Sequence, residues 1–460
     1  MILIIVSKWK KDLETKKFDI ILIGAGPAAI NFSIATQGSD KKVLAIEGDK
    51  FGGTCPNYGC EPKIFLEGAV RNVLSSQLLQ NRGIAQASTI DWNTLMKTKK
   101  ATWKNMPAAQ EMGFENLGID TLHGYAKFVD NHTVEVNGEQ YQADKIVIAT
   151  GQKPRKLNFP GSEYTHNSND VLDLDNLPKK TVFIGAGIVS MEMATLLAAA
   201  GSKVSIVEFL SRPMMAFSEK HVMNTVEDMK KRGIDFYFNQ GVSEIKKNDD
   251  QYEVITSAGT KLTADYVVDA SGRIANVDKL GLENTDVQLS KRGSIIVDDY
   301  LETNAKGVYA AGDVIEKKQP ALVPTAHFEA TYLGDQLVND KHDPIHYPII
   351  GASAFTFPQV AQVGVSVDEA RDNDEYTVVD MDHMFNTDME YAGKNDQSAK
   401  LSLVYNKQNQ LVGAAESSQN AIDDLNGIIP LIGLKITKEQ LNNSYQLIFP
   451  AVNFKTEFMG

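Results

Sequence analysis

The two cysteines of this 460-residue chain, Cys55 and Cys60, lie five positions apart in the run GGTCPNYGC. Two unrelated packing cysteines would rarely fall so close together, and the flanking glycines indicate a specialised backbone. Two cysteines are also too few for the disulfide scaffold of a small secreted protein. A pair this close is more often redox-active or metal-binding than structural, so it is the first candidate for chemistry.

The bulk composition is that of a soluble globular protein, with 43% hydrophobic and 23% charged residues. The length predicts about three domains. A net charge of −13 argues against a nucleic-acid partner, which needs a basic face. The apolar start, MILIIV, is too short for a signal-peptide core or a membrane span. We therefore expect a cytoplasmic protein without a membrane partner.

Two segments, residues 18–47 and 182–208, share one pattern. Each reads as a buried strand, a glycine-rich turn, a helix and a second strand that ends in an acid, Glu47 or Glu208. This is the dinucleotide-binding βαβ pattern, in which glycines let the backbone approach a pyrophosphate at a helix N-terminus. The acid then accepts hydrogen bonds from ribose hydroxyls. Two complete copies favour a cofactor-binding role for these glycines over a purely structural one.

The third glycine of the fingerprint is absent from both copies, where Ala29 and Ser190 stand. Both residues are small enough for close packing of helix on strand. Other buried strands end in ATG at residues 149–151, SGR at 271–273 and AGD at 311–313. From about residue 347 the pattern changes to alternating strands and turns, followed by a helical stretch near 421–434.

The order of these motifs, closed by FTFPQVAQVG, resembles that of the flavin-dependent pyridine nucleotide-disulphide oxidoreductases. Glutathione reductase, dihydrolipoamide dehydrogenase and mercuric reductase belong to that family. The resemblance runs from residue 18 onward and implies an α/β fold with two Rossmann-like domains, for FAD and NAD, plus a C-terminal α+β dimerisation domain. The implied segments are 1–155 for FAD, 156–275 for NAD(P)H, 276–345 for the return to the FAD domain, and 346–460 for the homodimer interface.

The resemblance also implies the cofactor contacts. Glu47 would bind the FAD ribose and Asp313 its ribityl chain or pyrophosphate, while a helix opened by Leu322 and Val323 would face the flavin C2 carbonyl. The other implied FAD contacts are Gly24, Gly26, Pro27, Ala28, Gly53, Thr54, Ala126, Thr150, Gly151 and Gly312. The implied nicotinamide-cofactor contacts are Gly185, Gly187, Ile188, Glu208 and Gly272.

Glu208 favours NADH over NADPH, because an acid at this position accepts bonds from a free 2′-hydroxyl and repels a 2′-phosphate. NADPH-using relatives have arginines here. Arg212 is the one nearby cation, and a surface role is as consistent with it as a phosphate role.

The implied reaction passes hydride from nicotinamide to FAD and two electrons on to a Cys55–Cys60 disulfide. Cys60 would be the flavin-side thiolate and Cys55 the thiol that meets substrate. Lys63 and Glu192 would form an ion pair near the flavin N5. Lysine stands one place earlier than in the common pattern, and Glu61 replaces the usual apolar residue. Glu61 either opposes an anionic reduced flavin or points to solvent.

A Cys55–Cys60 bond requires a distorted helix, because residues five apart rise about 7.5 Å along a regular axis and point to different sides. A disulfide needs Cα atoms within about 7 Å. Pro56 suits a helix start, and Gly59 gives the backbone latitude before Cys60. A helix N-terminus there would also lower the pKa of a thiol.

The C-terminus departs from the family pattern His-Pro-Thr-x-Ser-Glu, whose histidine moves protons during thiol exchange. Here Phe449 replaces the histidine and Phe454 the glutamate. Ile34 stands where glutathione reductases have an arginine, and the C-terminal cysteine pair of mercuric reductases is missing. His327 and His383 are available histidines, but we interpret His327 as structural and predict no metal site around His383.

These departures leave three functions open. The first is an NADH-dependent enzyme that reduces a disulfide or another small acceptor through Cys55 and Cys60. The second is a metal-ion or oxidant reductase that uses the same dithiol. The third is a redox-sensing flavoprotein with little turnover.

Overall fold

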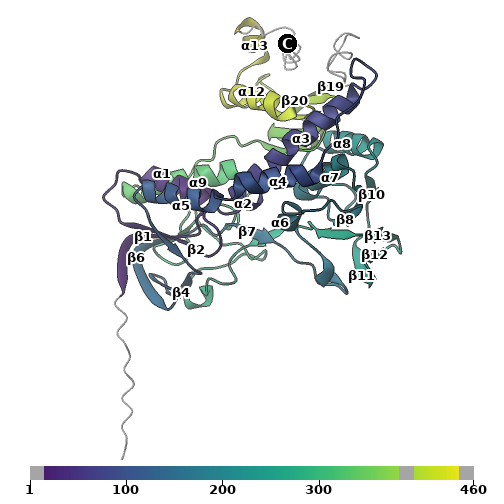
Figure 1. The fold of residues 1–460 in the computed structure, drawn as a ribbon. Helices are drawn as coiled ribbons and strands as arrows, with labels where there is room; N and C mark the ends of the chain where they lie inside the picture. Colours follow the sequence, from purple (N-terminus) through teal and green to yellow (C-terminus); the bar gives the residue numbers. More distant parts are fainter. Residues whose placement is uncertain (1–14, 383–397, 445–460) are drawn as a thin grey trace, which may run out of the picture. The chain divides into compact units, whose positions relative to one another are not determined.

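The computed structural model describes residues 15–382 and 398–444, which form two compact units (Figure 1). Unit 1 comprises the chain up to residue 57, residues 105–153 and residues 274–346. Unit 2 comprises residues 58–104, 154–273 and the chain from 347 onward. The chain passes between the units after residues 57, 104, 153, 273 and 346. Three of these crossings lie in α2 (Thr54–Tyr58), β7 (Gln152–Pro154) and β15 (Arg273–Ala275).

Unit 1 is built on a sheet with the strand order β3-β2-β1-β6-β5-β4, and β16 also pairs with β6. Strands β3, β2, β1, β6 and β16 run parallel to one another. Strands β4, β5 and β6 form an antiparallel meander. The strands are β1 (Lys16–Ile23), β2 (Val43–Glu47), β3 (Asp120–His123), β4 (Lys127–Asp130), β5 (Thr133–Val136), β6 (Glu139–Ile148) and β16 (Val308–Ala310). A parallel core explains the unbroken apolar and buried runs at the ends of β1 (residues 20–23) and β6 (residues 146–148).

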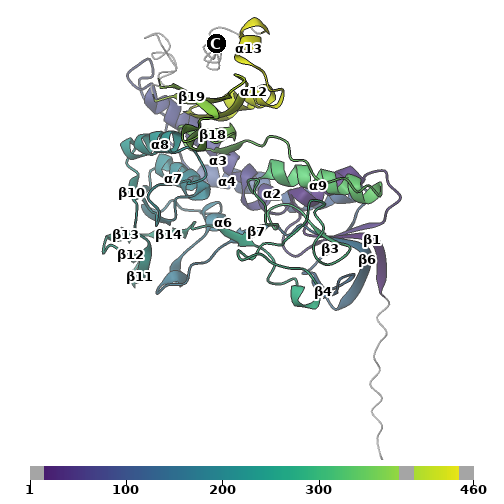
Figure 2. The same cartoon turned by 180° about the vertical axis from the view of Figure 1, so that it is seen from behind.

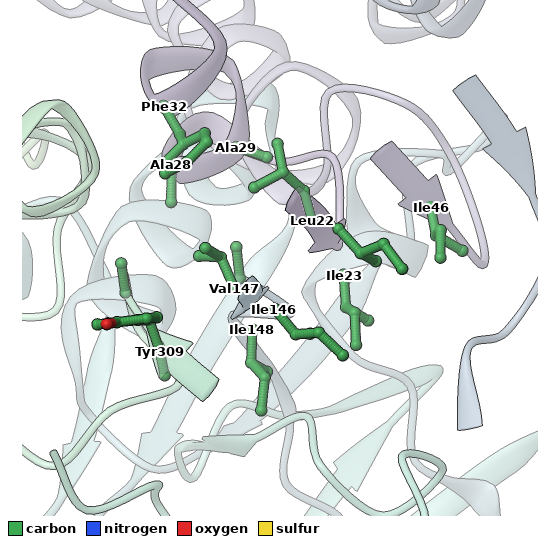
Figure 3. Close-up of a cluster of buried hydrophobic side chains, with 14 of the residues drawn as sticks. Leu22, Ile23, Ala28, Ala29, Phe32, Ile46, Ile146, Val147, Ile148 and Tyr309 are labelled. Atoms are coloured by element: carbon green, nitrogen blue, oxygen red, sulfur yellow. The ribbon is translucent and has the colours of Figure 1, made fainter. Parts of the chain in front are cut away.

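The helices of unit 1 cover one face of this sheet (Figure 1). They are α1 (Pro27–Thr36), α5 (Met106–Asn116) and α9 (Val323–Val338), with the short 3-10 turn η2 (Leu282–Asn284) elsewhere in the unit. Helices α1 and α9 lie side by side (Figure 1; Figure 2 shows α9 from behind), and Gly334 permits this because a Cβ there would lie 2.8 Å from Ala35 Cβ. In Figure 3, Ala28 and Phe32 of α1 face strands that carry Leu22 and Val147.

Unit 2 contains a second parallel sheet with the order β10-β9-β8-β14. Its strands are β8 (Lys180–Ile184), β9 (Lys203–Val207), β10 (Asp235–Tyr237) and β14 (Tyr266–Asp269). The antiparallel strands β11 (Val242–Asn248), β12 (Gln251–Thr256) and β13 (Lys261–Ala264) form a separate small sheet. The helical elements of this part are α3 (Cys60–Leu78), α4 (Trp92–Trp103), η1 (Ser162–Tyr164), α6 (Ser168–Val171), α7 (Ile188–Ala200) and α8 (Glu219–Lys231).

The C-terminal part of unit 2 is an antiparallel sheet with the order β17-β18-β21-β20-β19, and helix α12 packs on β18 and β21. Its strands are β17 (Ala352–Ala354), β18 (Gln359–Gly364), β19 (Tyr376–Met381), β20 (Lys400–Asn406) and β21 (Leu411–Ser418). Its helices are α10 (Val367–Arg371), α12 (Ala421–Gly433) and α13 (Lys438–Ser444).

The predicted fold class is confirmed: two parallel sheets of the dinucleotide-binding type precede a mixed α+β C-terminal part. The four segment boundaries stay a prediction. Compactness groups the chain differently, because residues 58–104 pack with the second nucleotide unit and with the C-terminal part. Three features that the sequence analysis discusses lie outside the described residues: the apolar start MILIIV, His383, and the stretch with Phe449 and Phe454.

Candidate active site

The first glycine turn connects β1 to α1 and needs glycine for steric reasons. Gly24 has φ +102°, and a Cβ there would lie 2.5 Å from the carbonyl oxygen of Ala149 at the end of β6. Gly26 is the N-cap of α1, and Pro27 is its first residue. The turn therefore presents the N-terminus of α1, with its unpaired backbone N–H groups, at the carboxyl edge of the sheet.

Glu47, at the end of β2, holds this turn in place. One carboxylate oxygen accepts the backbone N–H of Ala25 at 2.8 Å and the other accepts that of Asp49 at 2.8 Å. Burial raises the pKa of Glu47, while these backbone N–H groups lower it. A carboxylate has about four acceptor sites, so Glu47 can still bind ribose hydroxyls.

The cysteine loop packs directly on the same turn. Gly53 has φ +63°, and a Cβ there would lie 2.7 Å from the Cα of Gly26. Asn57 donates from its side-chain amide to the carbonyls of Phe51 and Gly53, each at 2.9 Å. Sequence reasoning missed Asn57, because an asparagine inside a cysteine motif carries no signal of which carbonyls it reaches. The segment before Cys55 is thus fixed against the dinucleotide turn.

The helix that carries the cysteines is interrupted, as the disulfide argument predicts. Cys55 lies in the short helix α2. The backbone leaves the helical conformation at Gly59, with φ −139° and ψ −111°, and α3 begins at Cys60. Cys60 is exposed and Cys55 is partly buried. As the first residue of a 19-residue helix, Cys60 lies where the helix dipole favours a thiolate. The disulfide itself stays a prediction.

A third segment reaches α1 through the AGD motif. Gly312 has φ +83°, and a Cβ there would lie 3.3 Å from Ala28 Cβ. The Gly312 N–H donates to Glu329 at 2.7 Å, and Lys317 donates to the Gly312 carbonyl at 2.9 Å. Lys317 and Glu329 also form an ion pair at 2.9 Å, with side chains 6% and 0% exposed. Sequence reasoning missed this buried pair, which fixes the backbone beside Asp313.

These parts of unit 1 fit an FAD molecule. Among the described residues, the buried hydroxyl of Thr150 has no hydrogen-bond partner, so a polar group remains for a ligand at the end of β6. Gly151 adopts φ +63° there, and Ala126 is buried. Leu322 caps α9 and Val323 begins it, as predicted. A dinucleotide site has these features: a glycine turn that lets the backbone come close to the ligand, a helix N-terminus, an acid and an unpaired hydroxyl.

The second glycine turn, between β8 and α7, repeats the first. Gly185 has φ +91°, and a Cβ there would lie 2.8 Å from the carbonyl oxygen of Ala270. A Cβ on Gly187, the N-cap before Ile188, would meet nothing within 4 Å, so this glycine leaves open space at the helix N-terminus. Within the described chain, the buried hydroxyls of Ser190 and Ser271 lack partners. The turn therefore fits a second dinucleotide.

Glu208 follows β9 and takes the position that Glu47 has in unit 1. It accepts the N–H of Ala186 at 2.5 Å and that of Leu210 at 2.8 Å. Arg212 is buried and donates to the backbone carbonyls of three following residues, Pro213, Met214 and Met215. Its guanidinium donates to these carbonyls and does not point outward to bind a phosphate.

The predicted ion pair between Lys63 and Glu192 is present. Lys63 Nζ lies 2.8 and 2.9 Å from the two carboxylate oxygens of Glu192, and the side chains are 14% and 5% exposed. Glu192 also accepts the N–H of Phe355 at 2.8 Å, and Lys63 Nζ lies 4.5 Å from the centroid of the Phe355 ring. The earlier position of the lysine does not prevent the pair, because Lys63 lies one turn into α3.

The other singled-out residues take ordinary positions. Glu61 and Ile34 are exposed, on the first turn of α3 and on α1. His327 is partly buried on α9, and burial lowers its pKa. Gly272 has φ +145° and lies beside Arg155. In the part of the chain that the structure describes, no three His, Cys, Asp or Glu residues form a potential metal site, and no helix is long and apolar enough to span a membrane.

The two units thus collect different parts of the predicted site. Unit 1 gathers the first glycine turn, the acid, the loop before Cys55, the ATG strand end and the AGD turn. Unit 2 contains Cys60, the ion pair and the second glycine turn. The predicted contacts of these residues with FAD and a nicotinamide cofactor stay predictions.

Comparison with known proteins gives the same family. The model of the pyridine nucleotide-disulphide oxidoreductases matches residues 18–330. The chain is 30% identical to a glutathione reductase of Burkholderia cepacia over 93% of this chain and 95% of that protein. It is 32% identical to a dihydrolipoyl dehydrogenase of Chlamydia pneumoniae over 77% of each. A dihydrolipoyl dehydrogenase of Geobacillus stearothermophilus is 29% identical over 91% of this chain and 89% of that protein. This chain belongs to the pyridine nucleotide-disulphide oxidoreductase family.

Proposed function

We propose that this protein is an FAD-dependent oxidoreductase that takes electrons from NADH and delivers them through Cys55 and Cys60 to a disulfide or another small acceptor. The observation that carries the proposal is the packing of the cysteine loop on the first dinucleotide turn. Gly53 lies so close to Gly26 that a Cβ on Gly53 would come within 2.7 Å of the Gly26 Cα, so a larger residue at position 53 requires movement. This packing holds the chain before Cys55 beside the turn that would carry FAD.

The FAD site would be formed by the first glycine turn, Glu47 and the AGD turn. Bound FAD would supply hydride acceptance, which no amino-acid side chain provides. The chain's own contribution is to bind and orient. Glu47 fixes the turn and keeps acceptor sites for ribose, Thr150 offers an unpaired hydroxyl, and the Lys317–Glu329 pair fixes the backbone next to Asp313.

The second turn would take NADH rather than NADPH. Glu208 is an acid at the position where a 2′-phosphate would lie, and Arg212 is committed to backbone carbonyls. A 2′-phosphate would therefore meet like charge without a compensating cation from these two residues. The open space at Gly187 leaves room for the pyrophosphate.

The thiols would divide the work. Cys60, at the N-terminus of α3, is the thiol that the helix dipole stabilises as a thiolate, and we assign it the cofactor side. Cys55 would exchange with the acceptor. The Lys63–Glu192 pair would hold a fixed charge near the flavin N5.

The remaining parts of the proposal concern the assembly. We propose a cytoplasmic homodimer formed through the C-terminal segment.

Because Phe449 replaces the family's histidine, no side chain at that position can move a proton, and the acceptor or water must do so. Glutathione and lipoamide should therefore turn over slowly.

An acceptor screen tests this function. NADH oxidation is measured with glutathione disulfide, lipoamide, quinones, oxygen, copper and mercury, with wild type and Cys55→Ser. We expect at least one acceptor whose reduction requires Cys55. If no acceptor depends on Cys55, the proposal fails, and a change in partner binding on oxidation would then indicate a sensor.

A further inference from the structure

One carboxyl group beside the Lys63–Glu192 pair is not explained by the family pattern or by packing. Glu67 is partly buried on α3. Within the described residues it forms no hydrogen bond and no ion pair, although its neighbours are charged. A partly buried carboxyl group without a partner at a candidate site needs a reason.

Its position on the helix gives that reason. Lys63, Glu67 and Arg71 follow at four-residue spacing, so they lie along one face of α3 with about 5–6 Å between neighbouring Cβ atoms. Glu67 therefore stands between two cations on its own helix.

Both cations are already engaged elsewhere. Lys63 donates to both oxygens of Glu192 on α7 and lies over the ring of Phe355. Arg71 donates to the carbonyl of Gln419 and to the side chain of Asn420, each at 2.5 Å. Glu67 is thus a second carboxyl group competing for Lys63, which holds Glu192 in preference.

The charges around Glu67 determine when it ionises. Burial raises the pKa of Glu67, while Arg71 and Lys63 lower it and Glu192 raises it. Helix α4 also packs on α3, but its buried Lys99 donates to the Leu172 carbonyl instead. Because burial is the largest effect, the carboxyl group holds its proton at a pH at which an ordinary glutamate has lost it.

We propose that Glu67 is a positioning residue for the redox centre. As a neutral carboxyl it leaves Lys63 to Glu192; as a carboxylate it draws Lys63 along α3 and adds a negative charge beside the pair. That added charge opposes the entry of electrons, so the centre accepts them more readily when Glu67 is protonated. The inference rests on the proposed function, since it requires the Lys63–Glu192 pair to act near the flavin.

The test follows the reduction of bound FAD by NADH in single-turnover experiments on the holoprotein, from about pH 5 to about pH 9. In the wild type the rate should fall about tenfold as Glu67 ionises. Glu67→Gln should remove that fall and keep the fast, low-pH rate throughout. Glu227→Gln, which changes an exposed carboxylate on α8, is the matched control and should behave as the wild type.

Two further measurements separate positioning from a structural role. The midpoint potential of bound FAD should show an additional pH-dependent step in the wild type that Glu67→Gln lacks. The infrared difference spectrum between low and high pH should contain a protonated-carboxyl band that Glu67→Gln loses. Glu67→Asp keeps a carboxyl group and should show the step at a shifted pH. Should Glu67→Gln not fold, this shift is the test, and a step at the wild-type pH in Glu67→Asp would overturn the role of Glu67.

The outcomes are distinct. An unchanged pH dependence, potential step and carboxyl band in Glu67→Gln would overturn the role of Glu67 while leaving the proposed function intact. Failure of NADH to reduce the wild type at any pH would instead contradict the proposed function, and with it this inference.

Discussion

At the scale of single residues, the two acids at the strand ends act on their own turns. Glu47 and Glu208 each use both oxygens to accept backbone N–H groups, one from the middle of the preceding glycine turn. The sequence predicts an acid at each position as a ribose ligand. It does not predict that the same carboxylate also fixes the turn, because that bond depends on the register of neighbouring strands.

Glu208→Ala tests both roles of this acid. We expect kcat/KM for NADH to fall about tenfold to a hundredfold while that for NADPH changes less, since the lost group binds the free 2′-hydroxyl. The variant should also lose about 1–3 kcal/mol of stability, because two backbone N–H groups lose their acceptor. Steady-state kinetics with both cofactors and urea unfolding measure these effects. An unchanged NADH-to-NADPH ratio would contradict the assignment.

The side-chain partners show where prediction from sequence stops. The Lys63–Glu192 pair could be expected from the family resemblance, and it is present. The Lys317–Glu329 pair could not, because nothing in the spacing of two residues on either side of a loop says that both reach Gly312. Asn57 and Glu67 were missed for the same reason: their importance depends on which groups the folded chain brings near them.

At the scale of elements, the glycines divide into those the fold requires and those it tolerates. Gly53 has positive φ and touches the backbone of Gly26, whereas Gly68 lies inside α3 with open space around it. We expect Gly53→Ala to destabilise the protein by about 1–3 kcal/mol and to weaken FAD binding. Gly68→Ala should stabilise it by about 0.5–1 kcal/mol, because alanine favours a helix.

Thermal unfolding and FAD fluorescence titration of these two variants provide the comparison. Equal behaviour of the two substitutions would mean that the cysteine loop does not pack on the dinucleotide turn as described. The interrupted helix at Gly59 was predictable from the geometry a disulfide demands. The start of α3 at Cys60 was not, because Pro56 indicated a helix start just after Cys55. The close approach of Gly53 to Gly26 was not, since it joins two separate segments.

The ion pairs of α9 give a second comparison within one element. Glu329→Gln leaves Lys317 buried beside a neutral group, which should lower the stability by about 3–5 kcal/mol and weaken FAD binding by displacing the AGD turn. Asp335→Asn on the same helix breaks an exposed pair with Lys341 and should change stability by less than about 1 kcal/mol. If both variants bind FAD as the wild type does, the buried pair does not position the turn.

At the scale of the whole molecule, a buried histidine joins helix α8 to the C-terminal sheet. His221 lies 2.9 Å from the Ser402 hydroxyl and 3.2 Å from that of Ser417. Burial, and to a lesser extent Lys220, lowers the pKa of His221 to about 3, against 6.5 for an ordinary histidine. The folded chain therefore keeps this ring neutral over a pH range in which the unfolded chain protonates it.

The sign of the pH effect follows from this difference. Below about pH 6.5 the unfolded state binds the additional proton. His221 should therefore lower the free energy of unfolding by about 1.4 kcal/mol for each unit by which the pH falls below this value. His221→Asn should show a shallower loss of stability between pH 6.5 and 3 than the wild type. Urea unfolding across this range measures it. Parallel pH profiles would contradict the buried, neutral state of the ring.

The overall architecture was largely predictable. Two glycine turns with their strands, and the change of pattern near residue 347, indicate two parallel units and a distinct C-terminal part, as found. The grouping of residues 58–104 with unit 2 was not predictable, because α3 continues a motif whose first half belongs to unit 1. The packing of α3 against α7, together with the bonds from Arg71 to Gln419 and Asn420, assigns it.

The central claim is that electrons from NADH reach the cysteine pair through FAD. Anaerobic titration of the holoprotein with NADH tests it most directly, with free thiols counted after each addition. The account predicts that the wild type takes up about two equivalents of NADH per chain and gains two thiols. One equivalent reduces FAD and the other reduces the Cys55–Cys60 disulfide, which takes two electrons. Cys55→Ser and Cys60→Ser should each take up about one equivalent. Uptake of about one equivalent by the wild type, with no change in thiol count, would contradict the account.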